Sequence, residues 1–138
     1  VSGPGLVIIY DFLRGYQQRI ENPDLRQAMI DGDPAAAISE FALKQCDELA
    51  IEALDMFIKI YGAQAGNLAL SVIPMAGLYI AGGIAAKNIE RFQDAGFLDA
   101  FREKGKMRHL VEKIPVYVIL QPKVGLMGAR LLAQQSVV

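Results

Sequence analysis

The stretch from Leu78 to Lys87 constrains the fold of this chain more than any other. An apolar run, Leu78 to Ala81, ends abruptly in Gly82 and Gly83, and a helix-compatible stretch begins directly after them. A buried strand that stops at glycines and turns into a helix brings bare backbone close to whatever lies above the sheet edge. Nucleotides bind at this position in α/β proteins. We therefore expect an α/β fold, with a nucleotide site as one explanation of the glycine pair and a simple turn as the other.

The composition is that of an ordinary globular domain and disfavours several classes of protein. At 138 residues, 53% of them hydrophobic, the chain has the length of one domain with a sizeable core. Lys and Arg number 14 against 15 Asp and Glu, so the net charge is -1, and no block of like charges stands out. This balance lacks the basic surface that electrostatic binding of nucleic acid requires. The single cysteine, Cys46, cannot form an intrachain disulfide and fits a reducing compartment, so we expect a cytoplasmic protein.

Two further features bear on membranes and on the start of the chain. The 27 residues between Lys59 and Lys87 carry no formal charge and are long enough in principle to cross a bilayer. Pro74 and the glycines after it break any continuous helix, so we expect a buried helix followed by a buried strand, not a membrane span. The chain opens at Val1 with a Gly-Pro-Gly turn and no secretion signal, which predicts a domain cut from a longer protein.

Apolar periodicity and turn residues predict a helix-rich chain with few strands. Helices are expected over about 6–19, 34–44, 47–72 and 124–134, with a further helical stretch over 86–113 interrupted near residues 96 and 105. In the first helix, Leu6, Ile9, Phe12 and Leu13 recur at helical spacing and predict one buried face.

The other predicted segments are two strands and a loop. Strands are expected over 78–81 and 115–120. The second run is apolar on both faces, which is typical of the interior of a parallel sheet. Residues 21–33 are predicted to form a polar loop, with a short helical turn as an option.

Two nucleotide-binding patterns use a glycine-rich turn of this kind, and the sequence departs from both. Flavoprotein reductases have a similar Ala-Gly-Gly-Ile opening followed by another glycine and a proline, whereas Gly83 is followed here by Ile-Ala-Ala-Lys. The dinucleotide fingerprint G-x-G-x-x-G is absent, and no acidic residue stands where that motif reads a ribose. A flavin or nicotinamide reductase therefore stays as a weaker hypothesis, which cofactor absorbance would test.

Several longer segments, taken in order, are more specific than the glycine pair. They are Ser2-Gly-Pro-Gly-Leu6, Ile60-Tyr-Gly-Ala-Gln-Ala-Gly-Asn-Leu-Ala-Leu70, Gly77-Leu-Tyr-Ile-Ala-Gly-Gly-Ile84, Gly96-Phe-Leu-Asp-Ala-Phe-Arg-Glu-Lys-Gly105, Ile114-Pro-Val-Tyr-Val118 and Val124-Gly-Leu-Met-Gly128. Together they closely resemble the C-terminal part of bacterial glucokinases, members of the hexokinase and actin-like ATPase superfamily. The resemblance covers essentially the whole chain. It implies the C-terminal portion of an actin-like, hexokinase-like (ribonuclease H-like) ATPase fold.

The resemblance also implies roles for three segments. Tyr79 to Ile84 is similar to the adenosine motif of the superfamily, in which the two glycines leave room for the adenine and ribose of ATP. Ser2 to Gly5 resembles a turn that the family places near the same cleft. The implied nucleotide-binding residues are Gly82, Gly83, Ile84, Ser2, Gly3 and Gly5. Val124 to Gly128 resembles the start of a helix near the hinge, so residues 1–120 would belong to the large domain and residues 121–138 would return toward the small domain.

Catalytic residues are not expected in this stretch. In related enzymes the phosphate loops lie upstream, and so does the Asn-Asp pair that binds the sugar and supplies the general base. The complete enzyme would transfer the γ-phosphoryl group of ATP to the 6-hydroxyl of glucose with Mg²⁺, and this portion alone would be inactive. A second hypothesis is a non-catalytic regulatory or interaction module of the same superfamily. The sequence that precedes Val1 would distinguish the two.

The remaining candidates are interpreted as structural. His109 lies in a charged helical stretch and is expected at the surface. Glu48, Glu52 and Asp55 share a helix face, which we expect to be a solvated acidic face and not a metal site. Core positions are expected for Met56, Met75 and Met127, and a buried or helix-end position for Cys46.

The predicted helix over 47–72 has a face of small residues that includes Gly62 and Gly66. Small residues let another backbone approach closely, either from the core or from a second copy of the chain. The sequence leaves core packing and a homodimer interface as equal explanations of this face.

Overall fold

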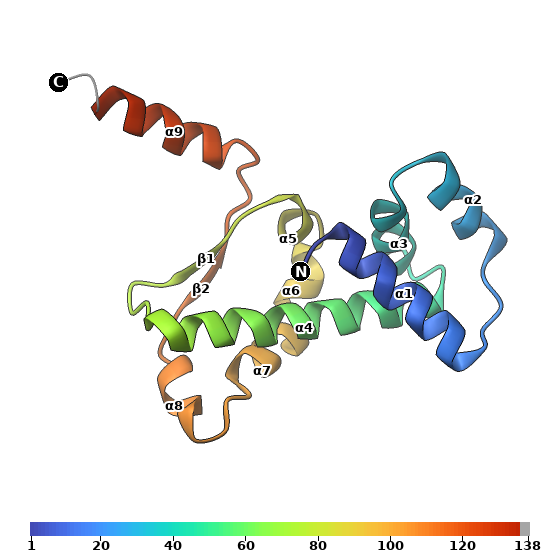
Figure 1. Cartoon of the computed structure of the whole chain (residues 1–138), viewed down its shortest axis with the longest axis horizontal. Helices are drawn as coiled ribbons and strands as arrows, with labels where there is room; N and C mark the ends of the chain where they lie inside the picture. The colour runs from blue at the N-terminus through green and yellow to red at the C-terminus, as the bar shows by residue number, and fades with distance from the viewer. Residues whose placement is uncertain (136–138) are drawn as a thin grey trace.

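The computed structural model describes residues 1–135, and it consists mainly of helices (Figure 1). The N-terminal helices are α1 (Gly3–Gln17), α2 (Pro23–Asp31), α3 (Pro34–Leu43) and α4 (Glu48–Val72). The strands are β1 (Leu78–Ile80) and β2 (Val116–Val118). Between the strands lie α5 (Gly83–Lys87), α6 (Ile89–Gln93), α7 (Ala95–Arg102), the 3-10 turn η1 (Gly105–Met107) and α8 (Arg108–Val111). The last described element is α9 (Val124–Gln135).

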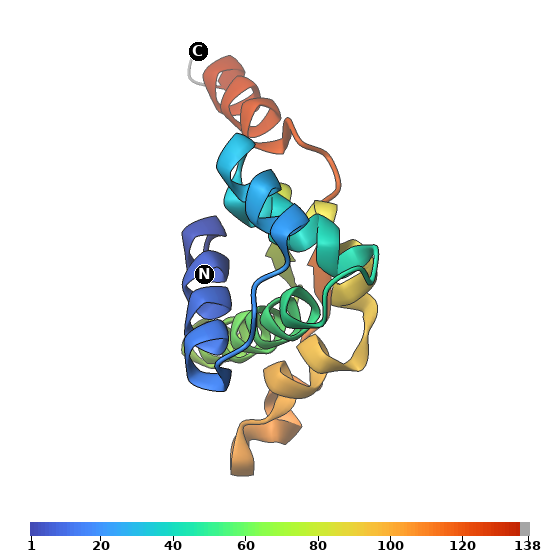
Figure 2. The ribbon, with the colours of Figure 1, turned by 90° about the vertical axis from the view of Figure 1, so that its right-hand side faces the viewer.

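The long helix α4 is the axis of the fold, as predicted. It begins at its N-cap, Asp47, whose side-chain oxygen accepts a hydrogen bond from the Ala50 N–H at 2.7 Å. Its buried residues include Leu54, Phe57 and Ile58, which share one face of the helix. The helices α1, α3 and α7 all pack against α4, and the two views of the ribbon show α1 and α7 on different sides of it (Figures 1 and 2).

The segment predicted as a polar loop contains the helix α2. The Asn22 side chain accepts hydrogen bonds from the N–H groups of Asp24 and Leu25, so it caps the helix, and Pro23 occupies the first helical position. Leu25 and Met29, four residues apart, are buried and attach α2 to the core. The loop prediction was therefore wrong, and the alternative of a short helical turn was nearer to this nine-residue helix. The prediction gave the polar residues of the segment more weight than its cap and its two apolar anchors.

The small residues of α4 pack against α7 within the chain. A Cβ atom added to Gly62 would overlap the backbone oxygen of Phe97, and one added to Gly66 would overlap that of Phe101. Both phenylalanines are buried, at 2% and 1% exposed. Of the two explanations of this face, core packing is the one that the structure supports.

The two strands form a parallel pair with Leu78 opposite Val116 and Ile80 opposite Val118. The Ile119 N–H extends the pairing by donating to the Ile80 carbonyl at 2.8 Å. On one face the rings of Tyr79 and Tyr117 stack with centroids 5.0 Å apart, and both side chains are about half exposed. The parallel arrangement agrees with the prediction, but among the described residues neither strand has a second neighbour, so an interior position for 115–120 is not observed.

Three apolar residues predicted to be buried are instead exposed. Phe12 is 58% exposed because it faces away from the side of α1 that packs on α3 and α4. Met75 lies in the turn after α4, and Met127 lies on α9, which extends away from the rest of the fold (Figure 1). Of the predicted core methionines only Met56 packs, partly buried, against the core. Cys46 is exposed just after the end of α3.

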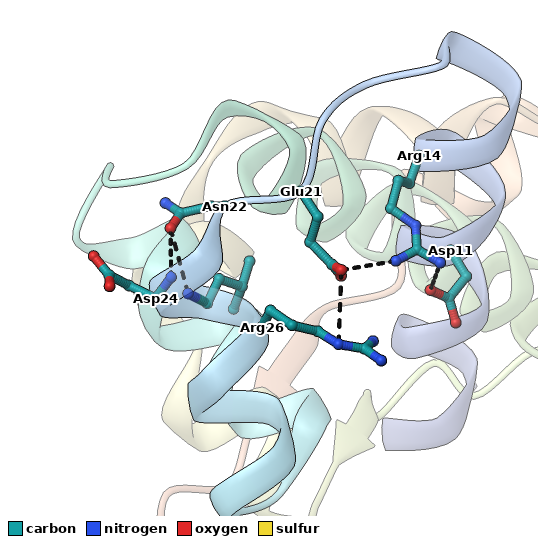
Figure 3. Close-up of polar contacts among 7 residues, drawn as sticks. Asp11, Arg14, Glu21, Asn22, Asp24 and Arg26 are labelled. Atoms are coloured by element: carbon teal, nitrogen blue, oxygen red, sulfur yellow. Dashed lines mark hydrogen bonds and ion pairs between the residues drawn. The ribbon is translucent and has the colours of Figure 1, made fainter.

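A group of charged side chains fixes the turn between α1 and α2 (Figure 3). The carboxylate of Glu21 lies 2.9 Å from Arg14 of α1 and 3.8 Å from Arg26 of α2. Arg14 also lies 3.3 Å from Asp11, one turn earlier in α1. Glu21 is only 17% exposed, so its two arginine partners offset part of the cost of removing this carboxylate from water.

The hydroxyl of Tyr10 offers a test of the interior beside this group. Tyr10 is fully buried, and its hydroxyl has no hydrogen-bond partner among the described residues. Burial, reinforced by the negative charge of Glu21, raises the pKa of Tyr10 to about 12. Because this lies above the ordinary value of 10.0, the stability associated with the neutral phenol is complete below pH 10 and is lost as the pH rises toward about 12.

Tyr10→Phe is expected to leave the free energy of unfolding at neutral pH unchanged or raise it by about 1 kcal/mol, because it removes an unpartnered buried hydroxyl. It should also reduce the loss of stability between about pH 10 and 12. Urea unfolding followed by circular dichroism measures both effects. A loss of more than about 2 kcal/mol at neutral pH would mean that the hydroxyl has a partner in solution.

Candidate functional site

A cleft of about 540 Å³ opens between α3, α5 and the first turn of α1. One wall is the face of α3 that carries Ala36, Ser39 and Leu43. Leu6 of α1 and Phe57 of α4 also line the cleft, and both side chains are almost completely buried. The interior of the cleft is therefore mainly apolar, which suits a flat, largely apolar group such as a nucleotide base.

The opposite wall begins at the glycine pair. Gly82 has a φ of +114°, a conformation that side chains rarely adopt, and it is the N-cap of α5. Gly83 and Ile84 follow in the first turn of α5 and line the cleft. A Cβ atom built on Gly83 would meet no atom within 4 Å, so the space above this residue is open to a ligand.

The third side of the cleft is the start of α1. Gly3 lines it, and a Cβ atom at this position would lie 3.2 Å from the Cβ of Ala35. The absence of a side chain at Gly3 therefore lets the start of α1 approach α3 closely. The Leu6 N–H donates to the Ser2 carbonyl at 3.2 Å, which places Ser2 at the N-terminal end of α1.

The structure brings together three of the six residues that the sequence predicted for a nucleotide site. Gly3, Gly83 and Ile84 line one cleft although they lie about 80 residues apart in the chain. Ser2, Gly5 and Gly82 flank these residues in sequence but do not line the cleft.

Sequence reasoning missed the wall that α3 provides. Its residues Ala36, Ser39 and Leu43 recur at helical spacing, and this periodicity predicted the helix but gave no sign of a ligand. Phe57 also gave no sign of a ligand in the sequence, because its spacing is that of an ordinary core residue of α4. Asp33 also lines the cleft, but its carboxylate accepts hydrogen bonds from the Ala35 and Ala36 N–H groups and serves as the cap of α3.

Charged groups lie at the rim of the cleft. Glu40 of α3 and Lys44, the residue that caps the end of α3, form an ion pair at 2.5 Å, and this contact raises the pKa of Lys44. Lys87 lies across the cleft at the end of α5, and within residues 1–135 it forms no ion pair. An apolar interior beside an exposed ammonium group suits a ligand that combines a ring with negative charge.

Asn88 is the polar residue of the cleft lining that is buried. It is 2% exposed, and its Nδ2 donates to the Ile84 carbonyl at 2.9 Å. This bond ties the end of α5 to its first turn, because Asn88 directly follows α5 and is its C-cap. Asn88 therefore stabilises the wall that begins at the glycine pair.

The acidic residues and the histidine that the sequence singled out make ordinary polar contacts. Among residues 1–135, no three side chains of the His, Cys, Asp or Glu type cluster as metal ligands would. Of the acidic face predicted on α4, Asp55 is ion-paired with Arg91, while Glu48 and Glu52 approach Arg19 at 3.9 and 3.6 Å. His109 is exposed, as predicted, and its Nδ1 contacts the Lys106 carbonyl oxygen at 2.8 Å.

Comparison with known proteins decides the family. The family model of Glucokinase matches residues 1–136. The chain belongs to the glucokinase family. It is 49% identical to a glucokinase of Nostoc punctiforme over 96% of the chain and 42% of that protein. It is 44% identical to a glucokinase of Synechocystis over 99% of the chain and 41% of that protein.

A solved glucokinase supports the same assignment. The crystal structure of a glucokinase from an Antarctic psychrotroph superposes with a TM-score of 0.79 at 28% identity, covering 97% of this chain and 39% of that one. The helix-rich fold with a small parallel sheet is thus found in a glucokinase. The chain spans about two fifths of the length of the glucokinases that it matches. Within residues 1–135, no helix combines the length and apolarity needed to cross a bilayer.

Proposed function

We propose that this chain is the C-terminal part of an ATP-dependent glucokinase and that its cleft binds the adenosine half of ATP. The observation that carries the proposal is the meeting of Gly3, Gly83 and Ile84 in one apolar cleft. The resemblance to glucokinases implied a nucleotide role for two segments, residues 2–5 and residues 79–84. These two segments supply the three residues that meet in the cleft. The fold that follows from the proposal is the C-terminal portion of an actin-like ATPase fold.

In this proposal the chain holds the end of ATP that does not react. The walls formed by Leu43, Phe57 and Ile84 exclude water from the adenine ring, and the open space above Gly83 admits the ribose. Lys87 at the rim complements the negative charge of the phosphates. Phosphoryl transfer depends mainly on positioning and charge stabilisation, so fixing adenosine contributes to the rate by orienting the triphosphate.

The remaining parts of the activity lie outside this chain's residues. Glucose, as the acceptor, and the general base that deprotonates its 6-hydroxyl are assigned to the rest of the enzyme. Among the described residues no cluster of side chains could hold Mg²⁺, so we propose no residue of this chain as a magnesium ligand. Residues 1–120 would form part of the large domain in the cytoplasmic enzyme, and residues 121–138, of which 136–138 lie outside the described residues, would lead toward the small domain.

The proposal is tested with the complete natural protein that contains this chain. We expect glucose 6-phosphate to form only when both glucose and ATP are present, measured in a coupled assay. ATP binding without sugar phosphorylation would favour the alternative, a non-catalytic regulatory module. If the complete protein neither bound ATP nor phosphorylated glucose, both the kinase proposal and the regulatory alternative would be contradicted.

A further inference from the structure

Asn88 joins two helices beside the cleft. It is the C-cap of α5 and the N-cap of α6, it lines the cleft, and it is 2% exposed. An asparagine at an N-cap ordinarily accepts a hydrogen bond from the first turn of the helix with its side-chain oxygen. The Asn88 side chain makes no such bond to α6. Helix capping therefore does not explain why this amide is buried here.

The amide of Asn88 has one end without a partner. Its Nδ2 donates to the Ile84 carbonyl, and because a carbonyl oxygen only accepts, this contact identifies the NH₂ end of the amide. The other end, Oδ1, is closed off from water and has no hydrogen-bond partner within residues 1–135. A buried acceptor without a donor is costly, and few occur in native proteins. The Oδ1 atom therefore lacks a donor that a ligand in the cleft would bring.

The hydrogen bond from Nδ2 is the second of two that the Ile84 carbonyl accepts. The backbone N–H of Asn88 donates to the same oxygen at 3.1 Å. The end of α5 therefore stays connected to its first turn through the backbone when the side chain moves. Turning the amide toward the cleft breaks one redundant bond, and it presents both Oδ1 and Nδ2 to a ligand.

Among the purine bases of nucleotides, adenine has the edge that matches an amide. Its 6-amino group donates and the neighbouring N7 accepts, whereas guanine presents two acceptors, O6 and N7, along the same edge. An asparagine amide pairs with the adenine edge through two hydrogen bonds, as it does when proteins recognise adenine in DNA. The apolar residues of the cleft, such as Leu43, Phe57 and Ile84, make no such distinction.

We propose that Asn88 recognises the 6-amino group of adenine and makes the enzyme select ATP over purine nucleotides that lack this group. This inference rests on the proposed function, in which the cleft binds adenosine. On binding, the amide turns toward the base, Oδ1 accepts from the 6-amino group, and Nδ2 donates to N7. Asn88 thus determines specificity by contact with the base and takes no part in phosphoryl transfer.

Steady-state kinetics of the complete natural enzyme with glucose and two nucleotides test the proposal. The nucleotides are ATP and purine riboside 5′-triphosphate, which carries hydrogen in place of the 6-amino group. The wild type is expected to have a kcat/KM about 30-fold higher with ATP, because the analogue leaves Oδ1 without a donor. A wild type that uses both nucleotides equally well would overturn this inference and leave the nucleotide site in place. A wild type that uses neither would contradict the proposed function itself.

Asn88→Leu removes the amide and nearly preserves the volume of the side chain. We expect the ratio of the two kcat/KM values to fall to about 3-fold or less, whereas a purely structural role of Asn88 would lower both values and leave their ratio unchanged. Leu43→Ala is the matched control, since it removes an apolar part of the same cleft and should weaken the use of both nucleotides alike. If Asn88→Leu does not fold, Asn88→Ala, which adds no bulk, gives the same comparison. Retention of the wild-type ratio by either folded variant would rule out Asn88 as the group that recognises adenine.

Discussion

Gly83→Val is expected to raise the KM for ATP by about 30-fold, with the affinity for glucose nearly unchanged. The added side chain would occupy the open space above Gly83, which we assign to the nucleotide. Overpacking of a filled site costs about 2 kcal/mol, which corresponds to about 30-fold in binding. Because no protein atom lies within 4 Å of a Cβ at this position, the free protein should fold normally.

Steady-state kinetics of the complete enzyme, with glucose binding measured by calorimetry, separates the two effects of Gly83→Val. The matched control is Gly96→Val. Gly96 also lies in the first turn of a helix, and a Cβ there would make only ordinary contact with the Lys59 side chain, 3.8 Å away. This control should leave the KM for ATP unchanged. A normally folded Gly83→Val enzyme with a wild-type KM for ATP would remove Gly83 from the nucleotide site.

Gly62→Ala is expected to lower the free energy of unfolding by about 3 kcal/mol, at the upper end of overpacking effects. The new Cβ would overlap the backbone oxygen of Phe97, and a backbone atom of a packed helix cannot move aside as a flexible side chain can. Either α7 shifts away from α4 or the contact is lost. Relatives of this chain are about two and a half times as long, so in the complete protein the corresponding decrease in Tm is about 4 °C.

Scanning calorimetry of the complete protein measures the effect of Gly62→Ala. Gly15→Ala is the control, because a Cβ at Gly15 meets nothing within 4 Å and alanine favours the helix by up to about 1 kcal/mol. This control should be neutral or stabilising. A change below about 1 kcal/mol for Gly62→Ala would show that α7 adapts freely, contrary to the close packing described above.

The features that the sequence predicted are those set by local chemistry. Periodic apolar residues predicted α4 to within one residue at its start, and the parallel strands followed from two short apolar runs. The glycines at 82 and 83 predicted the turn into α5, because glycine adopts the backbone conformations that a sharp turn after a strand requires. These signals involve residues close together in the chain.

The features that sequence reasoning missed depend on which neighbours meet in space. Phe12 and Leu13 both recur at helical spacing with Leu6 and Ile9. Phe12 nevertheless lies on the face of α1 that no other described element covers. Ser39 joins a cleft only because the approach of Gly3 to Ala35 places α1 against α3. Gly62 fits a dimer interface or a core equally well until α7 is located. The apolar character of a residue does not predict which element of the chain, or which other chain, covers its side chain.

Photolabelling with 8-azido-ATP tests the central claim most directly, because the reactive group is carried by the adenine ring itself. The complete enzyme would be irradiated with the probe and digested, and the labelled peptides identified by mass spectrometry. The account predicts label on peptides from residues 3–6, 33–44 or 83–88, and loss of that label in excess ATP. Saturable label that excess ATP removes, found only on peptides that do not line the cleft, would contradict the assignment of the cleft to adenosine.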